Sequence, residues 1–302
     1  MSTTTIGTYK DITLHIDGQI GTITLTVYWL NRPHTLNTFG GDLIIETISA
    51  LEWLDKNPDT VFTVLTGAGR FFSAGADVHS VNEILSKSSL GKNEALDITK
   101  ATSQQVEKTK DKTAYLSHFS THVELMRSII DHHKVFVVAL NGPAVGGGAA
   151  WFPAIADIVL ASSNCYLQVP FSALGLVPEL GSAPIFSQCM GIHRTNEFLM
   201  FGRRLDAPEL EGCGLINRIF PVLNFQSHVS QYLLEILATS DGQSLIEAKR
   251  LMNQPLRAGR LAAVVESVDA LANRFVSGAP RDRFLMKKRE LEHKSKSRMS
   301  KI

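Results

Sequence analysis

One carboxylate stands in an otherwise apolar segment in the second half of the chain. The stretch LGLVPELGS, residues 174–182, surrounds Glu179 with apolar residues, small residues and a proline. Burial among apolar groups disfavours the charged form of a carboxyl group and raises its pKa toward neutrality. A carboxyl group with such a pKa can both remove and return a proton at working pH. Glu179 is therefore our first candidate for a general base.

The same residues fit a second interpretation. Pro178 is a residue type that starts helices, and a glutamate in the first helical turn is favoured by the helix dipole. In that case Glu179 is an exposed surface residue. The local sequence does not separate the two interpretations.

Two glycine-bearing turns follow two apolar runs. GAGRFFSAGAD (67–77) comes after the run at 61–67, and NGPAVGGGAA (141–150) comes after VFVVAL at 135–140. The second turn also opens a predicted helix, whose free N–H groups favour a negative charge. Two such turns facing each other could supply two converging N–H donors, which form an oxyanion hole. The alternative is that both are tight turns that need small residues.

The glycine triplet is not a nucleotide-binding motif. Its spacing is wrong for GxGxxG, and no P-loop lysine follows it. Ser, His and Asp are not arranged around a nucleophile elbow, which disfavours a hydrolase.

The elements that must position these residues alternate between strands and helices. A β-hairpin is expected over 12–28, and residues 80–113 read as an exposed helix or loop near the ligand entrance. The remaining predicted elements are a helix over 40–55, a strand over 61–67, a helix over 115–132, a strand over 135–140, a helix from the second turn to about residue 156, short strands over 157–160 and 166–169, and helices over 183–190, 193–201, 225–239, 243–253 and 260–277. This order predicts an α/β core followed by a helical C-terminal region.

Composition excludes some classes of function. The chain has 302 residues, 44% of them hydrophobic, and a net charge of +1, which gives nucleic-acid binding no electrostatic support. No apolar run approaches the roughly 20 residues of a membrane span, and the N-terminus lacks the pattern of a signal peptide. Cys165, Cys189 and Cys213 form no metal-ligand pattern with histidine, so no metal site is expected.

The chain ends in Ser300-Lys301-Ile302, preceded by basic residues. This tripeptide is close to the S-K-L peroxisomal signal. It predicts a peroxisomal location and an import receptor as a partner, and the alternative is a frayed basic tail.

The pair of turns resembles a known family. FFSAGADV followed some 65 residues later by NGPAVGGG is similar to the crotonase family, also called the enoyl-CoA hydratase/isomerase superfamily. The order of motifs matches over about residues 10–260, including RRLDAPELEGCGLINRIF at 203–220. The resemblance implies a crotonase (ClpP-like) fold of repeated ββα units, with a helical C-terminal region that assembles homotrimers or homohexamers. We expect a core over 1–200, a helical region over 201–280 and a charged tail over 281–302.

The resemblance also implies site residues. The backbone N–H groups of Ala76 and Gly147 would form the oxyanion hole for an acyl-CoA thioester, where each donor is typically worth about 3 kcal/mol in the barrier. The segment Ala74, Gly75, Ala76, Asp77 and Val78 would hold the CoA and acyl portions of the substrate. CoA is part of that substrate, so no separate cofactor is expected.

Hydratases of this family carry two glutamates, and both are missing here. The matching positions hold Ala150 and Phe171, so water addition by the usual family route is disfavoured. Glu179 falls in a segment that resembles the Δ3,Δ2-enoyl-CoA isomerases, which have a glutamate there. Pro153 departs from the pattern, because it would kink the predicted helix that carries the oxyanion donor.

The sequence therefore predicts a peroxisomal enoyl-CoA isomerase that moves a double bond from C3 to C2, with Glu179 as the proton shuttle. Two alternatives remain open. One is a related enzyme that tailors an acyl-CoA in specialised metabolite synthesis. The other is a catalytically silent crotonase fold that binds acyl-CoA.

Overall fold

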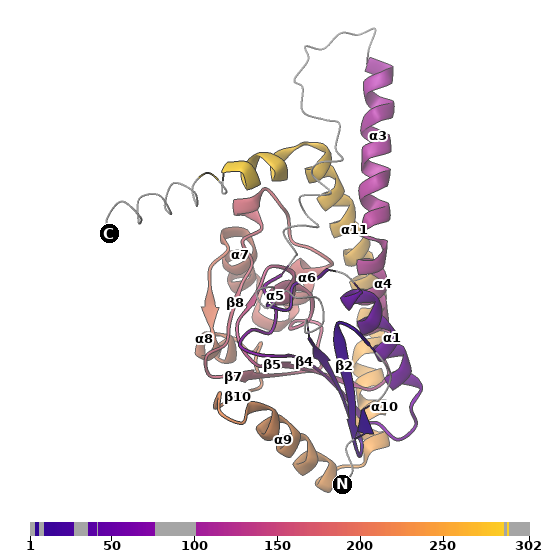
Figure 1. Cartoon of the computed structure of the whole chain (residues 1–302), viewed down its shortest axis with the longest axis vertical. Helices are drawn as coiled ribbons and strands as arrows, with labels where there is room; N and C mark the ends of the chain where they lie inside the picture. Colours follow the sequence, from indigo (N-terminus) through magenta and orange to yellow (C-terminus); the bar gives the residue numbers. More distant parts are fainter. Residues whose placement is uncertain are drawn as a thin grey trace, which may run out of the picture.

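A computed structural model of the chain describes residues 4–5, 9–26, 36–40, 42–75, 101–286 and 289. Within this part the chain forms an α/β fold built on a seven-stranded sheet (Figure 1). The strands lie in the order β1-β2-β3-β4-β5-β7-β10. The two pairs among β1, β2 and β3 are antiparallel, and the remaining pairs are parallel. The strands of this sheet are Thr4–Thr5 (β1), Ile12–Asp17 (β2), Ile20–Leu25 (β3), Phe62–Gly67 (β4), Val135–Leu140 (β5), Ile158–Ser162 (β7) and Arg218–Phe220 (β10).

The central strands are buried on both faces, as parallel strands usually are. Alternate residues of β5 face opposite sides of the sheet. Val135, Val137 and Ala139 pack in one apolar cluster with β4 and helix α9, Phe225–Thr239. Phe136 and Val138 pack in the larger cluster on the other face. The predicted strands at 61–67 and 135–140 are confirmed, because a fully apolar run suits a strand covered on both sides.

On the larger cluster's side, α1, α4 and α11 lie together along one side of the fold, and α3 projects beyond them (Figure 1). Helix α11 contacts α3, α4 and α6, and α1 contacts α4. These helices are Leu43–Lys56 (α1), Ala101–His118 (α3), Ser120–Ile130 (α4), Ser182–Met190 (α6) and Arg257–Val276 (α11). The single helix predicted over 115–132 is in fact two helices, α3 and α4, that meet at Phe119.

A small three-stranded sheet stands beside the main one. Its order is β6-β8-β9, where β6 is Ala144–Val145, β8 is Tyr166–Gln168 and β9 is Leu205–Asp206. The remaining elements are Gly147–Trp151 (α5), Ser172–Leu174 (η2), Ile192–Phe201 (α7), Ala207–Gly212 (α8), Gly242–Asn253 (α10) and Gln254–Leu256 (η3). Among the described residues, no helix is long and apolar enough to cross a membrane.

The chain after residue 200 is mainly helical, as predicted, but it also adds strands to both sheets. Strand β9 pairs with β8, and β10 pairs with β7 in the main sheet. The fold class predicted from the sequence, an α/β core with a helical C-terminal region, is confirmed.

Candidate active site

The two glycine-bearing turns lie at the carboxyl ends of neighbouring parallel strands. Strand β4 ends at Gly67 and β5 ends at Leu140. The side chain of Asn141 joins the turns, because its Oδ1 accepts from the Gly67 N–H at 3.0 Å and its Nδ2 donates to the Gly69 carbonyl at 2.9 Å. Adjacent parallel strands bring their carboxyl ends to one edge of the sheet, so turns 74 residues apart in the chain meet here.

The turns also touch farther from the strand ends, at Gly75 and Gly146. The backbone at Gly75 has φ +90°, and a Cβ on it would lie 2.8 Å from the Val145 carbonyl oxygen. Gly146 has φ +57° and faces the Cα of Gly75. Only glycine fits this close approach, because a side chain at either position would be strained. The expected proximity of the two turns is therefore present in the structure.

Two of the predicted binding residues, Ala74 and Gly75, lie at the end of the first glycine turn, and Gly75 makes this contact. The Ala74 N–H donates to the Leu36 carbonyl at 2.9 Å, and the Gly75 carbonyl accepts from the Phe39 N–H at 2.8 Å. The other residues of that segment, Ala76, Asp77 and Val78, lie outside the described residues. The same is true of the tail residues Ser300, Lys301 and Ile302.

Gly147 is the first residue of helix α5. As the first helical residue, its N–H has no carbonyl partner within the helix. Helix α5 ends at Trp151, so the prediction of a helix to about residue 156 is wrong. Pro153 lies in the turn after the helix and does not kink it. A proline at this position would clash with the carbonyl four residues earlier in a longer helix, so the helix ends first.

Glu179 lies in an irregular segment before helix α6, which begins at Ser182. Two residues with left-handed backbone follow it, Leu180 with φ +49° and Gly181 with φ +79°. The Gly181 N–H donates to Ser267 Oγ of helix α11 at 2.8 Å, which fixes this turn against the C-terminal helix. Glu179 is therefore not in the first turn of a helix begun by Pro178, and that interpretation is wrong.

The Glu179 carboxyl group has a specific partner. The Trp151 indole N–H donates to Glu179 Oε2 at 3.0 Å, and Trp151 is only 5% exposed. Glu179 is partly exposed as a whole residue, but its carboxyl group is enclosed by protein atoms. This burial raises the pKa of Glu179 to about 7, against a smaller lowering by the Trp151 hydrogen bond. The carboxyl group can thus exchange a proton near neutral pH.

The surroundings of Glu179 are apolar and aromatic. Leu176 and Val177, from the same segment, pack against a cluster that is built by helices α3 and α11. The aromatic members of this cluster are Tyr115 and Phe275, and Phe119 packs against them. The Glu179 carboxyl group is buried, which agrees with the first of the two interpretations of LGLVPELGS and not with an exposed surface residue.

The positions of the two missing hydratase glutamates belong to the core. Ala150 is 3% exposed and Phe171 is 2% exposed. Among the described residues, no charged group shifts the pKa of Glu179. The part of the site that the structure describes therefore holds one carboxylate.

Sequence reasoning missed Trp151 and His122. Trp151 stands four residues after Gly147 on α5. Residues at i, i+4 spacing are neighbours on a helix surface, so the sequence could have indicated that Trp151 lies beside Gly147. The His122 ring meets the Trp151 ring edge-on, with centroids 5.2 Å apart. Burial, with a smaller effect of His118, lowers the pKa of His122 to about 4, so the ring is neutral at pH 7.

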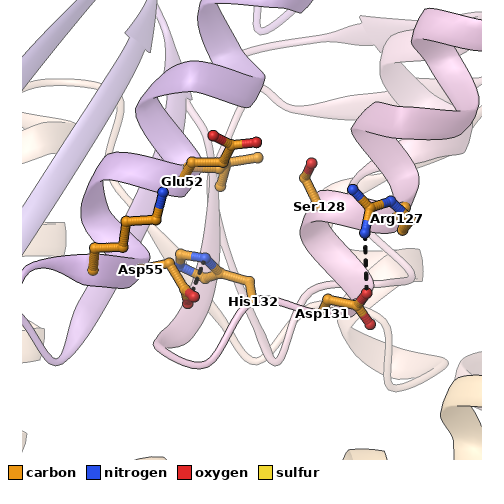
Figure 2. Close-up of a pocket in the computed structure, with 8 residues that line it drawn as sticks. Glu52, Asp55, Arg127, Ser128, Asp131 and His132 are labelled. Atoms are coloured by element: carbon orange, nitrogen blue, oxygen red, sulfur yellow. Dashed lines mark ion pairs between the residues drawn. The ribbon is translucent and has the colours of Figure 1, made fainter.

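A pocket of about 270 Å³ between α1 and α4 is separate from this site. Its lining includes Asp55 and His132, which face each other at 3.3 Å, and Arg127 and Asp131, which pair at 3.9 Å (Figure 2). His132 precedes β5, so the pocket lies at the amino end of that strand and the glycine turns at the carboxyl end. These four side chains are paired with one another, which explains them structurally. The described residues hold no cluster of three or more His, Cys, Asp or Glu residues that could bind a metal.

The fold and the site define an α/β protein of the crotonase class, and its similarity to known proteins supports this. A family model described as enoyl-CoA hydratase/isomerase matches residues 21–108 and 96–289. The chain therefore belongs to the enoyl-CoA hydratase/isomerase family, as its motifs predicted. A crystal structure of an enoyl-CoA hydratase/isomerase from Pseudoalteromonas atlantica has the same fold, with a TM-score of 0.74 and 21% identity over 93% of this chain and 98% of that one.

Two similar proteins are named as isomerases. A Delta(3,5)-Delta(2,4)-dienoyl-CoA isomerase of Pyricularia oryzae is 29% identical over 90% of this chain and 94% of its own length. A 3,2-trans-enoyl-CoA isomerase of Saccharomyces cerevisiae is 31% identical over 84% of this chain and 88% of its own length. These relatives confirm the prediction of an isomerase-like enzyme.

Proposed function

We propose that the protein moves the double bond of an enoyl-CoA from C3 to C2, with Glu179 as the only proton carrier. The observation that carries this proposal is the enclosed Glu179 carboxyl group, with a pKa near 7 and a hydrogen bond from Trp151. A carboxyl group near its pKa at working pH is suited to take a proton and to give it back.

The reaction balances with one carboxyl group. The Glu179 carboxylate removes a proton from C2, and the electrons form a dienolate with negative charge on the thioester oxygen. The same carboxyl group then returns the proton to C4, and the double bond lies between C2 and C3. No net proton enters or leaves, so neither water nor a second acid is required.

The developing oxyanion would be stabilised by the backbone N–H groups of Ala76 and Gly147. The contact between Gly75 and Gly146 supports this assignment, because it brings the two turns that carry these donors together. Donors that are fixed before the reaction stabilise the charge without reorganisation, and losing one typically costs about 10²–10³-fold in rate. The segment from Ala74 to Val78 would hold the acyl-CoA beside them.

A hydratase needs an activated water, and the core positions of Ala150 and Phe171 offer no carboxylate to hold one. A 3,5-dienoyl substrate is a closer competitor, because three of the relatives are named for that reaction. There the proton returns to C6, four bonds from C2, instead of to C4. A single carboxyl group held in place by Trp151 is better suited to the shorter transfer.

The test is turnover of a 3-enoyl-CoA, followed as formation of the conjugated 2-trans product, with a 3,5-dienoyl-CoA and a 2-enoyl-CoA hydration assay beside it. Glu179→Gln should lose about 10²–10⁴-fold in kcat, the usual contribution of a general base. Glu235→Gln, on the exposed face of α9, is the matched control. Full activity of Glu179→Gln would disprove the mechanism. Binding of acyl-CoA without any turnover would support the silent homologue, and turnover restricted to unusual acyl groups would support a tailoring enzyme.

We also propose that the protein works in the peroxisome and assembles as a homotrimer or homohexamer. Relatives from Arabidopsis thaliana and Mus musculus are named as peroxisomal isomerases, which supports the location. Deleting Ser300-Lys301-Ile302 from a tagged chain tests the location, and an unchanged distribution would contradict it. Light scattering of the purified protein tests the assembly.

A further inference from the structure

Trp151 contacts both halves of the candidate active site. Its indole N–H donates to Glu179 Oε2 at 3.0 Å. Its six-membered ring covers Gly147, because a Cβ on that glycine would lie 2.6 Å from Trp151 Cζ2. One rigid side chain therefore touches the residue proposed as the base and the residue proposed as an oxyanion donor.

The same ring is also linked to the first glycine turn. Phe39 stacks on Trp151, with ring centroids 4.5 Å apart and planes 28° apart. The Phe39 backbone N–H donates to the Gly75 carbonyl at 2.8 Å. Trp151 is thus connected to Gly147 directly and to Gly75 through one intermediate residue.

The position of the indole is strongly constrained. Trp151 is 5% exposed, Phe39 lies against one side and His122 meets the ring edge-on at 5.2 Å. An indole has only two side-chain torsions, and both are restricted by this packing. A donor fixed in this way holds its acceptor in one place, which is what a positioned catalytic group requires.

The other titratable groups near Glu179 do not offer a competing charge. His122 on α4 is neutral at pH 7, since burial lowers its pKa to about 4. On α3, Tyr115 stacks on Phe275, and His118 meets the His122 ring at 6.3 Å. The Arg274 guanidinium on α11 donates to the Gly175 carbonyl at 3.1 Å, and Lys112 pairs with Asp269. Within the described part of the chain, Trp151 is the polar partner of the Glu179 carboxyl group.

From this geometry we propose that Trp151 is a positioning residue. It holds the Glu179 carboxyl group in a fixed position relative to Gly147 and favours the ionised form of that carboxyl group. The proposal rests on the proposed function. It adds that the base depends on a particular donor on α5, four residues after Gly147.

The first test is the pH dependence of kcat/KM in wild type and in Trp151→Phe. Phenylalanine keeps an aromatic ring but removes the N–H donor. Loss of a hydrogen bond to a carboxylate favours its protonated form. The acidic limb of the kcat/KM profile should therefore shift to higher pH by about one unit. We expect kcat at pH 7 to fall about tenfold, with KM changed less than threefold. A merely structural role would lower activity at all pH values without moving the limb.

Trp53→Phe on α1 is the matched control, since Trp53 is 37% exposed. Circular dichroism and binding of a saturated acyl-CoA establish that each variant is folded. A limb that stays in place in folded Trp151→Phe overturns the inference. If Glu179→Gln still abolishes turnover in that case, the proposed function stands without the positioning role.

A second test does not require turnover. The fluorescence of Trp151 should change as its acceptor ionises, giving a titration with a midpoint near pH 7 that vanishes in Trp151→Phe and in Glu179→Gln. Survival of that titration in either variant contradicts the contact, even if the enzyme proves to have another substrate.

Discussion

Ser73 and Gly148 are packed so closely that no side chain fits between them. A Cβ on Gly148 would lie 2.6 Å from Ser73 Cβ and 2.9 Å from its Oγ. That hydroxyl donates to the Asn37 carbonyl at 2.7 Å and accepts from the Gly75 N–H at 3.2 Å. The contact therefore sets the distance between α5 and the first glycine turn.

Gly148→Ala should displace Ser73 and, through it, Gly75. Overpacking of this kind typically lowers the unfolding free energy by about 1–3 kcal/mol. We also expect kcat/KM to fall about tenfold or more, because a shift of the turn misplaces an oxyanion donor. Urea unfolding and steady-state kinetics measure the two effects.

The control for this change is Gly259→Ala in helix α11, where an added Cβ meets nothing within 4 Å. Alanine is the better helix former, so this variant should be neutral or more stable by up to about 1 kcal/mol. Equal behaviour of the two variants would contradict the role of the Ser73 contact.

Glu179→Gln should make the protein more stable at alkaline pH while it removes activity. Burial raises the pKa of Glu179 from 4.5 to about 7, so between these values the folded state binds more protons than the unfolded state. Stability then falls as pH rises through this window, and above pH 7 the ionised group costs about 3 kcal/mol. Urea unfolding at pH 5 and pH 8 should show a gain for the variant mainly at pH 8. A gain of equal size at both pH values would show that the carboxyl group is not the cause.

The buried pair of Lys249 and Asp157 should be essential for stability. The Lys249 ammonium lies 2.8 Å from Asp157 and donates to the Lys134 carbonyl at 2.6 Å. Burial lowers the pKa of Lys249, and the nearby carboxylate opposes that effect. Lys249→Met leaves Asp157 without its cation and should cost about 3–5 kcal/mol, the usual penalty for an uncompensated buried charge.

The double variant Lys249→Met/Asp157→Asn should recover part of this loss, because it removes the uncompensated charge. Lys108→Met, on the exposed side of α3, serves as the control. A single variant as stable as the control in urea unfolding would disprove the structural role of the pair.

His132 should make the fold sensitive to acid. Burial, together with the charge of Lys249, lowers its pKa to about 3, although the charge of Asp55 acts in the opposite direction. Between pH 3 and 6.5 the unfolded state binds more protons, so stability rises with pH through this window and is complete above about pH 6.5. His132→Gln should flatten the rise in melting temperature between pH 4.5 and 7. The exposed His193→Gln should keep the wild-type slope, and an unchanged slope in both variants would exclude His132 as the cause.

Much of the fold and part of the site could be predicted from the sequence. The apolar runs at β4 and β5 are short and are followed by glycine-bearing turns, which predicted strands covered on both faces. The segment around Glu179 was compatible with a buried or an exposed carboxylate, and the structure separates the two. These predictions depended on local composition and on the order of the predicted elements along the chain, both of which can be read from the sequence.

The contacts of Trp151 could not be predicted in the same way. Trp151 and Glu179 are 28 residues apart, and their contact depends on the left-handed turn at Leu180 and Gly181. A leucine does not predict left-handed backbone, since leucine rarely adopts that conformation. The predicted length of α5 is wrong for a different reason. The apolar run continues past Trp151, and Pro153 was expected to kink the helix rather than to end it.

Transfer of a labelled proton tests the central claim most directly. The substrate is a 3-enoyl-CoA that carries deuterium at C2, and the product is analysed for deuterium at C4. A single enclosed carboxyl group predicts that most wild-type product carries at C4 the deuterium taken from C2, and that Glu179→Gln gives almost no product. Hydrogen at C4 that comes entirely from solvent, or undiminished turnover by Glu179→Gln, would contradict Glu179 as the proton shuttle.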